Sequence, residues 1–440
     1  MRKSLKERLA HIWLYLSTLL KWIAFAVVTG IICGVVGSVF HIGVHHATEL
    51  RMKHPWLLYC LPLAGLLIGV VYKGLKTTGY GTNTIIDEVH TGKGISFWLL
   101  PTIFLTTMLT HLCGGSAGRE GAALQMGGTI GYHAGRAFRL DDRDERIATM
   151  VGMAAFFTAL FGTPMAATYF SMGVISVGIM YHAALVPCLI SALSAYGVSL
   201  VMGVEPTRFT ITMPALELGM MLRVLGLSVL CALVSILFCR VMHFFEHVVQ
   251  RMENEWLRCA LGGVCIIILT LLCGTTDYNG AGMEVITAAV ESGQARPEAF
   301  LLKLLFTAIT LSVGYKGGEV VPSFFVGATF GCVAAPLLGI PAGVGAAIGM
   351  VAVFCGATNC PMASIFLAVE LFGDGGLMYF ALACGISYLL SGYNGLYSSQ
   401  TIMYSKLKAQ YINVRTNHHH AGDPHAEPPV HGNVKDRNKK

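Results

Sequence analysis

The stretch that decides the fold reads Gly114-Gly-Ser-Ala-Gly-Arg-Glu-Gly-Ala-Ala-Leu-Gln-Met-Gly-Gly128. Its glycines allow backbones to approach closely and allow positive φ angles before the segment becomes helical. A helix that begins here presents unpaired N–H groups and the positive end of its dipole, which together favour an anion. A phosphate-binding loop is excluded because no Gly-Lys-Ser/Thr follows. The segment therefore predicts a helix start that accepts an anion, with Glu120 at that start.

The composition is that of a membrane protein. Of the 440 residues, 54% are hydrophobic and 12% are charged, and the mean hydropathy is +0.64, whereas about a quarter of the residues of a soluble protein are charged. Several apolar stretches are shorter than the ~20 residues that cross a bilayer. Short helices broken by Gly and Pro persist at membrane depth only when they are buried in protein or line a cavity. We therefore expect an all-α integral membrane transporter or channel; its apolar stretches are 13–36, 56–71, 97–112, 183–201, 218–238, 259–273, 301–313 and 344–355.

Both ends of the chain are polar. The charged start resembles a signal peptide, but a long apolar stretch containing Lys21 follows, without an obvious cleavage site. We interpret residues 1–19 as a cytoplasmic N-terminal segment and residues 411–440 as a disordered cytoplasmic tail. The His418-His-His run can bind metal, although a solvated tail is the favoured interpretation.

An internal repeat appears when the chain is shifted by 200 residues. Identical residues then align at five positions of the glycine-rich stretch and at the pair Met150-Val151: Gly114 with Gly314, Gly118 with Gly318, Gly127 with Gly327, Thr129 with Thr329, Gly131 with Gly331, and Met150-Val151 with Met350-Val351. We expect a first membrane repeat over residues 20–205 and a second over 206–410. Transporters built from repeats usually hold their substrate near the midplane, at broken helices between the copies.

Three further motifs are candidates for the site. Gly317-Gly-Glu-Val-Val-Pro is the counterpart of the first motif, and its Pro322 suits the first turn of a helix. Gly79-Tyr-Gly-Thr-Asn offers Thr82 and Asn83 as donors to an anion, although both residue types are also ordinary helix caps. Ser391-Gly-Tyr-Asn-Gly-Leu-Tyr closes the membrane region, where a tyrosine is often an interfacial anchor.

Glu120 is a functional candidate because an ionisable side chain at membrane depth usually has a role in transport. The alternative is a carboxylate that only caps its own helix. For Glu319 the same two interpretations are open, a role in transport or a helix cap. Two carboxylates that lie close together resist being ionised at once, which would make one of them a proton carrier, whereas a cap would only stabilise the helix.

The four motifs, in this order, resemble those of the CLC chloride channels and chloride/proton antiporters over about residues 15–405. Gly118-Arg-Glu-Gly resembles the gating-glutamate motif, Gly81-Thr-Asn the first anion-binding motif, and Gly317-Gly-Glu-Val-Val-Pro the second, while Tyr397 resembles the central tyrosine. The resemblance implies two inverted repeats of short, tilted and broken helices. It also implies a homodimer with one pore per subunit and several spans in a bacterial-type inner (cytoplasmic) membrane.

Where the sequence differs from the chloride motifs, it resembles the fluoride-exporting branch of the family. Thr82-Asn83 replaces the serine of the first anion-binding motif. In the second motif, Val320 occupies the position of a phenylalanine and Glu319 that of an apolar residue. No acid occurs in residues 167–175, where the antiporters carry an inner relay glutamate, and Ala122 replaces a proline. The resemblance implies fluoride/proton exchange that exports fluoride, with Glu120 and Glu319 as gating and proton-transfer groups. The implied anion-binding residues are Gly81, Thr82, Asn83, Val320, Val321, Phe324, Phe325 and Tyr397.

Physical chemistry agrees with this choice of residues. Fluoride is strongly hydrated, so a selective site must replace the lost water with strong donors, and an Asn amide has two. Phe324 and Phe325 can present electropositive ring edges, although adjacent phenylalanines in a membrane helix more often serve packing or lipid contact.

Two rival classes remain open. A chloride/proton antiporter or chloride channel of the same family would use the same scaffold. A membrane-embedded enzyme would need a nucleophile–base or metal constellation such as His-Glu-x-x-His in an apolar segment, and we find none. We interpret His243, Glu246 and His247 as an interfacial helix face. We therefore expect no enzymatic activity, no cofactor, no metal and no nucleic-acid partner; the expected partners are fluoride or chloride, protons, the bilayer and a second copy.

Overall fold

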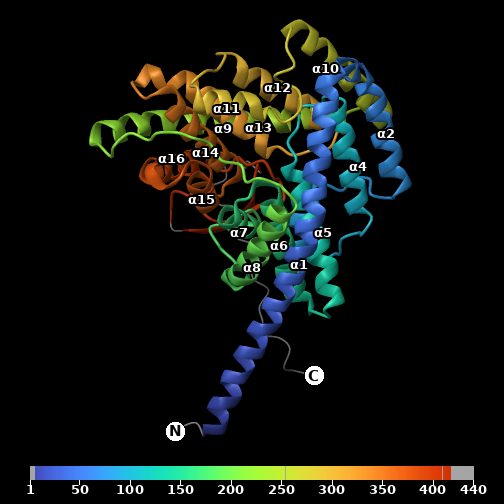
Figure 1. Ribbon diagram of the computed structural model, residues 1–440, viewed down its shortest axis with the longest axis vertical. Coiled ribbons are helices and arrows are strands. Elements are labelled where there is room, and N and C mark those ends of the chain that lie inside the picture. Colours follow the sequence, from blue (N-terminus) through green and yellow to red (C-terminus); the bar gives the residue numbers. More distant parts are fainter. Residues whose placement is uncertain (1–4, 253, 409, 418–440) are drawn as a thin grey trace.

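Helices make up most of the computed structural model, which describes residues 5–252, 254–408 and 410–417 (Figure 1). The first half contains α1 (Leu5–Lys53), α2 (Leu61–Gly74), α3 (Thr82–Thr91), α4 (Leu99–Leu112), α5 (Glu120–Ala137), α6 (Asp142–Phe161), α7 (Pro164–Gly173) and α8 (Leu185–Val201). The second half contains α9 (Leu218–Gln250), α10 (Glu255–Cys273), α11 (Met283–Glu291), α12 (Ala299–Ser312), α13 (Val320–Ala334), α14 (Ala342–Thr358), α15 (Pro361–Phe372) and α16 (Leu377–Leu390). Short 3-10 helices lie at Pro55–Cys60, His182–Ala184, Ala335–Leu338 and Asp374–Gly376.

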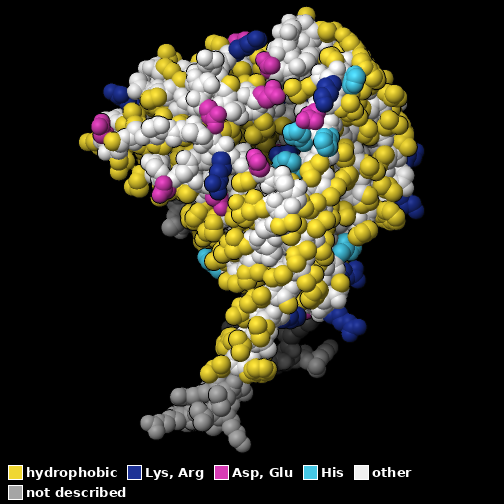
Figure 2. Space-filling model, viewed as in Figure 1, with side chains coloured by type: hydrophobic (Ala, Val, Ile, Leu, Met, Phe, Trp, Pro, Cys, Tyr) yellow, Lys and Arg dark blue, Asp and Glu magenta, His cyan; other side chains and the backbone are white. Residues whose placement is uncertain are grey.

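The helices have the lengths expected of a broken-helix membrane protein. Among the described residues, 6 helical segments are long and apolar enough to cross a membrane, and several further apolar helices of 10–17 residues are shorter than a span. The visible face is covered largely by hydrophobic side chains (Figure 2). The longest helix, α1, runs along one side of the molecule from its lower end to its top (Figure 1). The predicted fold class, an all-α membrane protein with broken helices, is confirmed.

The two halves repeat one arrangement of helices. The starts of α4, α5 and α6 at residues 99, 120 and 142 return 200 residues later in α12, α13 and α14 at 299, 320 and 342. The loops that precede α5 and α13 meet in an antiparallel bridge between Gly118 and Gly318. Each of these glycines donates its N–H to the carbonyl of the other at 2.8 Å. The antiparallel pairing of equivalent residues agrees with two copies in opposite orientation.

Glycines bring the helices of each pair into contact. A Cβ atom on Gly127 of α5 would collide with the carbonyl oxygen of Gly152 on α6, and one on Gly327 of α13 would collide with that of Gly349 on α14. Only glycine permits this approach of two backbones. The aligned glycines of the sequence are therefore the contact points between α5 and α6 and between α13 and α14.

The repeats also share their helix boundaries. Helix α6 ends at Gly162 and α14 at Asn359, both in the left-handed conformation, which is a common way to end a helix. A proline then opens the next helix, Pro164 in α7 and Pro361 in α15, where its missing N–H costs no hydrogen bond. The sharp reversals keep α7 and α15 close to the helices that precede them.

A small sheet closes the described part of the chain. Strand β1 (Ser176–Val177) pairs in parallel with β2 (Thr401–Tyr404), with Ser176 opposite Thr401, and β2 pairs antiparallel with β3 (Tyr411–Arg415). We expected a disordered tail from residue 411, and the position of β3 corrects this expectation for the first residues of the tail. The reason is that Tyr411, Val414 and Arg415 pair with residues of β2, a long-range contact that the polar composition of the tail does not indicate.

Two further predictions concern the ends of the chain. Helix α1 runs without a break from Leu5 to Lys53 and so crosses the boundary expected at residue 19, and the cytoplasmic N-terminal segment over residues 1–19 stays a prediction. The tail residues His418, His419 and His420 lie outside the described residues. The membrane side on which each end lies stays a prediction.

Candidate ion-transport site

The predicted motifs meet around one cavity of about 350 Å³. Gly81, Thr82 and Asn83 reach it from the start of α3, Glu319 from the start of α13, and Tyr397 from the segment after α16. The structure thus brings together five of the predicted residues from three separate parts of the chain. The cavity is also lined by polar residues outside that set: Gln125, His243, Glu246, Gln250, Arg258 and Lys316.

Glu120 lies behind this cavity and joins the two repeats. Its side chain is fully buried at the first position of α5. Its Oε2 atom accepts a hydrogen bond from the Val321 N–H at 3.3 Å, so the carboxylate lies at the start of α13, a place where a helix favours negative charge. Backbone N–H groups of Arg119 and Glu120 also face it, whereas Oε1 has no partner among the described residues. The side chain therefore does more than cap its own helix.

Glu319 lies on the cavity side of the same junction. It is the residue immediately before α13, and its Oε2 atom is buried without a partner in the described part of the chain. It interacts electrostatically with both Glu120 and Tyr397. The Tyr397 hydroxyl is buried and also lacks a hydrogen-bond partner among the described residues. Buried polar groups are normally satisfied by protein, water or an ion, so the two groups mark a place suited to one of these.

Asn83 and Thr82 accept hydrogen bonds through their oxygen atoms, which leaves their own donor groups available. The Ser399 N–H donates to Asn83 Oδ1 at 3.1 Å, and no hydrogen bond of the Asn83 amide nitrogen is found within the described residues. Gln125 Nε2 donates to Thr82 Oγ1 at 3.2 Å, which leaves the Thr82 proton free to be donated. Both residues therefore offer donors, the groups that a small anion requires. Neither side chain makes a cap hydrogen bond at the start of α3.

The two phenylalanines pack away from the cavity. Phe324 contacts Phe354 and Phe161 edge-on, with ring centroids 5.0 Å and 6.3 Å away. Phe325 lies 6.3 Å from the ring of Tyr278. Both rings are buried, and neither lines the cavity. This geometry favours the packing alternative over direct anion contact.

Two residues at or near the site were missed from the sequence: Gln125, which lines the cavity, and Lys303, which interacts electrostatically with Glu120. Gln125 lies in the first motif, where a polar residue among apolar neighbours was the available signal. Lys303 of α12 is fully buried, donates to the carbonyls of Tyr278 at 3.1 Å and Gly280 at 2.6 Å, and lies 5.2 Å from the Phe325 ring. A single lysine within an apolar stretch was its signal.

Helix α9 supplies two cavity residues that we had placed on an interfacial face. His243 and Glu246 line the cavity with Glu319, and they interact through Nδ1 and Oε2 at 3.4 Å. His243 Nε2 also lies 2.8 Å from the Gly395 carbonyl oxygen. His247 is exposed, as an interfacial residue would be. The earlier interpretation is therefore wrong for His243 and Glu246, because helix periodicity alone does not show which neighbours cover a face.

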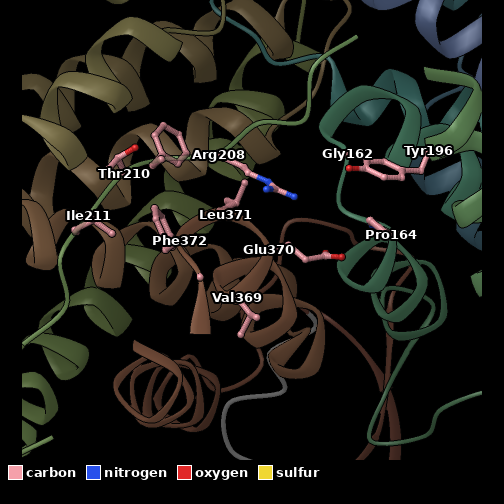
Figure 3. A pocket seen from close by; sticks show the side chains of 12 residues that line it. Gly162, Pro164, Tyr196, Arg208, Thr210, Ile211, Val369, Glu370, Leu371 and Phe372 are labelled. Carbon is pink, nitrogen blue, oxygen red and sulfur yellow. The ribbon is translucent and has the colours of Figure 1, made fainter. Parts of the chain in front are cut away.

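A second cavity of about 690 Å³ contains a carboxylate that was also missed (Figure 3). Glu370 extends from α15 toward Pro164 at the start of α7 (Figure 3). Its two oxygens accept hydrogen bonds from the N–H groups of Met165 and Ala166, each at 2.9 Å. Glu370 thus caps a helix of the other repeat. An acid within an apolar helix was the signal that could have found it.

Comparison with known proteins identifies the family. The pattern of the family described as "Voltage gated chloride channel" matches residues 64–392, so the chain belongs to this family, the CLC channels and transporters. It is 37% identical to the "Chloride/fluoride channel protein" of Pseudomonas syringae pv. tomato, over 88% of this chain and 87% of that protein. It is 26% identical to the "H(+)/Cl(-) exchange transporter ClcA" of Vibrio vulnificus, over 81% and 83%.

Solved structures share the fold. The crystal structure of a CLC-type fluoride/proton antiporter superposes with a TM-score of 0.83 at 32% sequence identity, covering 87% of this chain and 98% of that one. The structure of a slow cyanobacterial Cl-/H+ antiporter gives a TM-score of 0.72 at 20% identity, covering 84% and 94%. The membrane part of the chain is therefore a CLC transport fold over nearly its whole length.

Proposed function

We propose that this protein exchanges fluoride for protons and exports fluoride across the inner membrane of a bacterial-type cell. The observation that carries the proposal is the Glu120 carboxylate, which binds the Val321 N–H at the start of α13, while Glu319, which interacts with it electrostatically, lines the cavity. An anion and a movable carboxylate can compete for the same helix start. The names of a relative and of a solved structure that include fluoride support the choice of anion.

The anion path follows from the donors around the cavity. Fluoride would enter past Thr82 and Asn83, whose hydroxyl proton and amide nitrogen have no acceptor among the described residues. It would then pass the Tyr397 hydroxyl and reach the Val320 and Val321 amides when Glu120 moves away. Each of these donors replaces part of the hydration that fluoride loses. Gly81 allows the anion to approach the start of α3 closely because it has no side chain.

The proton path uses the two acids at the junction of the repeats. Helix α7 has no acid in its sequence. Glu370 is engaged through both oxygens in capping α7, which leaves Glu319 as the carboxylate next to Glu120 that has an unpartnered oxygen within the described residues. A proton carried by Glu319 would pass to Glu120 while fluoride leaves in the other direction. Two neighbouring buried carboxylates favour a shared proton.

Anion efflux from proteoliposomes separates fluoride from chloride transport. Purified protein is reconstituted with equal internal fluoride or chloride, and efflux is followed with electrodes specific for each ion. We expect fluoride efflux well above the rate of protein-free liposomes and slower chloride efflux. Equal or faster chloride efflux would instead support a chloride/proton antiporter or chloride channel.

By family resemblance we also propose a homodimer with one pore in each subunit. Mixed dimers provide the test: one subunit carries an inactive gate and the other is unchanged. Half the activity of the unmodified dimer is expected for two independent pores. Complete loss of activity would contradict independent pores.

A further inference from the structure

Three potential metal ligands lie together on α1. His45 Nδ1 is 3.6 Å from Glu49 Oε1, and His46 Nδ1 is 3.5 Å from Glu49 Oε2. Ligand atoms of all three side chains lie within 4.8 Å of one another. Glu49 is four residues after His45 and three after His46, so its carboxylate neighbours both histidines on the helix surface. Rotation of these exposed side chains would bring the three donors to a common ion.

The cluster lies where the lipid-facing part of α1 ends. Between Ile12 and Val39 the exposed residues of α1 are apolar apart from Thr18 and Lys21. The apolar run after Lys21 spans about 27 Å, close to the ~30 Å of bilayer hydrocarbon. The next exposed side chains are His45 and His46, at 61% and 71% exposure, with Glu49 at 44%. His side chains gather beside the upper half of α1 on the visible face (Figure 2). The cluster therefore faces water or headgroups rather than hydrocarbon.

The donor set selects a class of metal. Two imidazole nitrogens and one carboxylate oxygen suit Zn²⁺ and neighbouring transition metals, whereas Mg²⁺ and Ca²⁺ prefer oxygen ligands. Three protein ligands leave one position of a tetrahedral ion for water. The carboxylate also offsets part of the charge of the ion.

A short series of ionisable groups connects the cluster to the gate. His41, one turn before His45, interacts electrostatically with both His45 and Arg119. Arg119 in turn interacts with its neighbour Glu120. A dication at His45 would therefore act on the groups that surround the gating carboxylate. It would oppose protonation of Glu120 and hold an anion nearby, and both effects slow a proton-coupled exchange.

We propose that His45, His46 and Glu49 form a Zn²⁺-class metal site whose occupancy slows transport. The site itself is independent of the transported ion, whereas its effect on rate rests on the proposed fluoride/proton exchange. Binding and transport must therefore be measured separately. The His418-His-His run would bind metal by itself, so every protein carries alanines at His418, His419 and His420 and no histidine tag.

Zn²⁺ binding to detergent-solubilised protein tests the site without reference to transport. Calorimetric titration should show one site per chain, weakened at least about tenfold in H45A/H46A and in E49A, since even outer partners of metal ligands contribute about that much to affinity. H54A removes an exposed histidine just beyond α1 and should bind as tightly as the unchanged protein. Equal binding in H45A/H46A, or no binding in the unchanged protein, would overturn the site.

Transport with and without Zn²⁺ then tests its consequence. Zn²⁺ should slow fluoride efflux by the unchanged protein and by H54A, while H45A/H46A and E49A should keep their rates, and Mg²⁺ should have no effect. Unaltered efflux in a protein shown to bind Zn²⁺ at this site would overturn the proposed control of transport. A protein without fluoride efflux in any condition would contradict the proposed function instead, and the binding result would stand.

Discussion

Glu120 is the first residue of α5, whereas Glu319 stands one residue before the equivalent helix α13. The helices and the glycine contacts around the two acids are otherwise alike. A displacement of one residue at a helix start changes the direction of a side chain by about 100°. Glu120 therefore turns toward the Val321 N–H of the other repeat, while Glu319 lines the cavity. The comparison shows that two equivalent helix starts can place one acid between the repeats and the other in the wall of the cavity.

Helices α7 and α15 provide a second contrast. Glu370 is the ninth residue after Pro361, and Gly173 is the ninth after Pro164. Glu370 caps α7, whereas the bare Gly173 lies against Cys360, the residue before α15, with an added Cβ 3.5 Å from its sulfur. The second repeat thus caps a helix of the first repeat through Glu370, and the first repeat has no equivalent carboxylate. The two halves therefore differ more in the positions of their acidic residues than in the arrangement of their helices.

The largest effect is expected from Glu120→Gln. The amide retains the shape of the side chain but cannot carry a proton, so fluoride gradients should no longer drive proton movement. Internal pH of proteoliposomes, read with a trapped dye, measures this. E205Q serves as the control because Glu205 is exposed and does not line the cavity. Uphill proton movement in E120Q at the ratio of the unchanged protein would contradict the role given to Glu120.

Glu319→Gln tests whether the second acid is a relay or a cap. A relay predicts loss of fluoride-driven proton uptake in a protein of unchanged stability. A cap predicts normal uptake and a loss of about 1 kcal/mol in the free energy of unfolding. Proton uptake and thermal unfolding in detergent are measured on the same preparation. We expect the first result, because the Oε2 atom of Glu319 has no partner in the described part of the chain.

Asn83→Ser should weaken the preference for fluoride over chloride by about 1–3 kcal/mol, the range for leaving a desolvated polar group unmatched. The ratio of the two efflux rates measures the preference. Thr82→Ser is the matched control, because it keeps the hydroxyl that accepts from Gln125. If N83S retains the fluoride preference of the unchanged protein, the selective donors lie elsewhere, with Thr82 and the α13 amides as the remaining candidates.

Much of this arrangement could be predicted from the sequence because it depends on local chemistry. Glycines that permit backbone contact, and the matching registers of the repeats, identify α5 and α13 as partners. Contacts between distant segments could not be predicted. His243 and Glu246 reach the cavity only because α9 packs beside the loop before α13, and Glu370 reaches α7 across the repeats. Strand β3 likewise depends on its partner β2.

Glu370→Gln should have a smaller effect, on stability rather than coupling. The amide would place a donor against one of the two N–H groups at the start of α7, at a cost of about 2 kcal/mol. Thermal unfolding in detergent should occur at lower temperature, while the fluoride-to-proton ratio stays the same. A changed ratio would show that Glu370 takes part in proton transfer and would replace the account in which it only caps α7.

The smallest effect is expected from removing residues 418–440. Their polar, proline-containing composition predicts no docking to the membrane part. Removal from residue 416 should be more harmful, since Thr416 donates to the Tyr397 carbonyl at 2.5 Å and Asn417 contacts the Gly395 carbonyl at 2.8 Å. Efflux rates of the two truncations measure the difference. Loss of activity on removal from residue 418 would assign a function to the tail.

The central claim is that the two acids at the junction couple fluoride to protons. Its most direct test is a proteoliposome that contains only this protein, with a fluoride gradient and no initial pH difference, and with chloride in a parallel experiment. The account predicts that outward fluoride movement drives protons inward, against a gradient that builds up, while chloride drives little. Fluoride movement without proton movement would contradict coupled exchange.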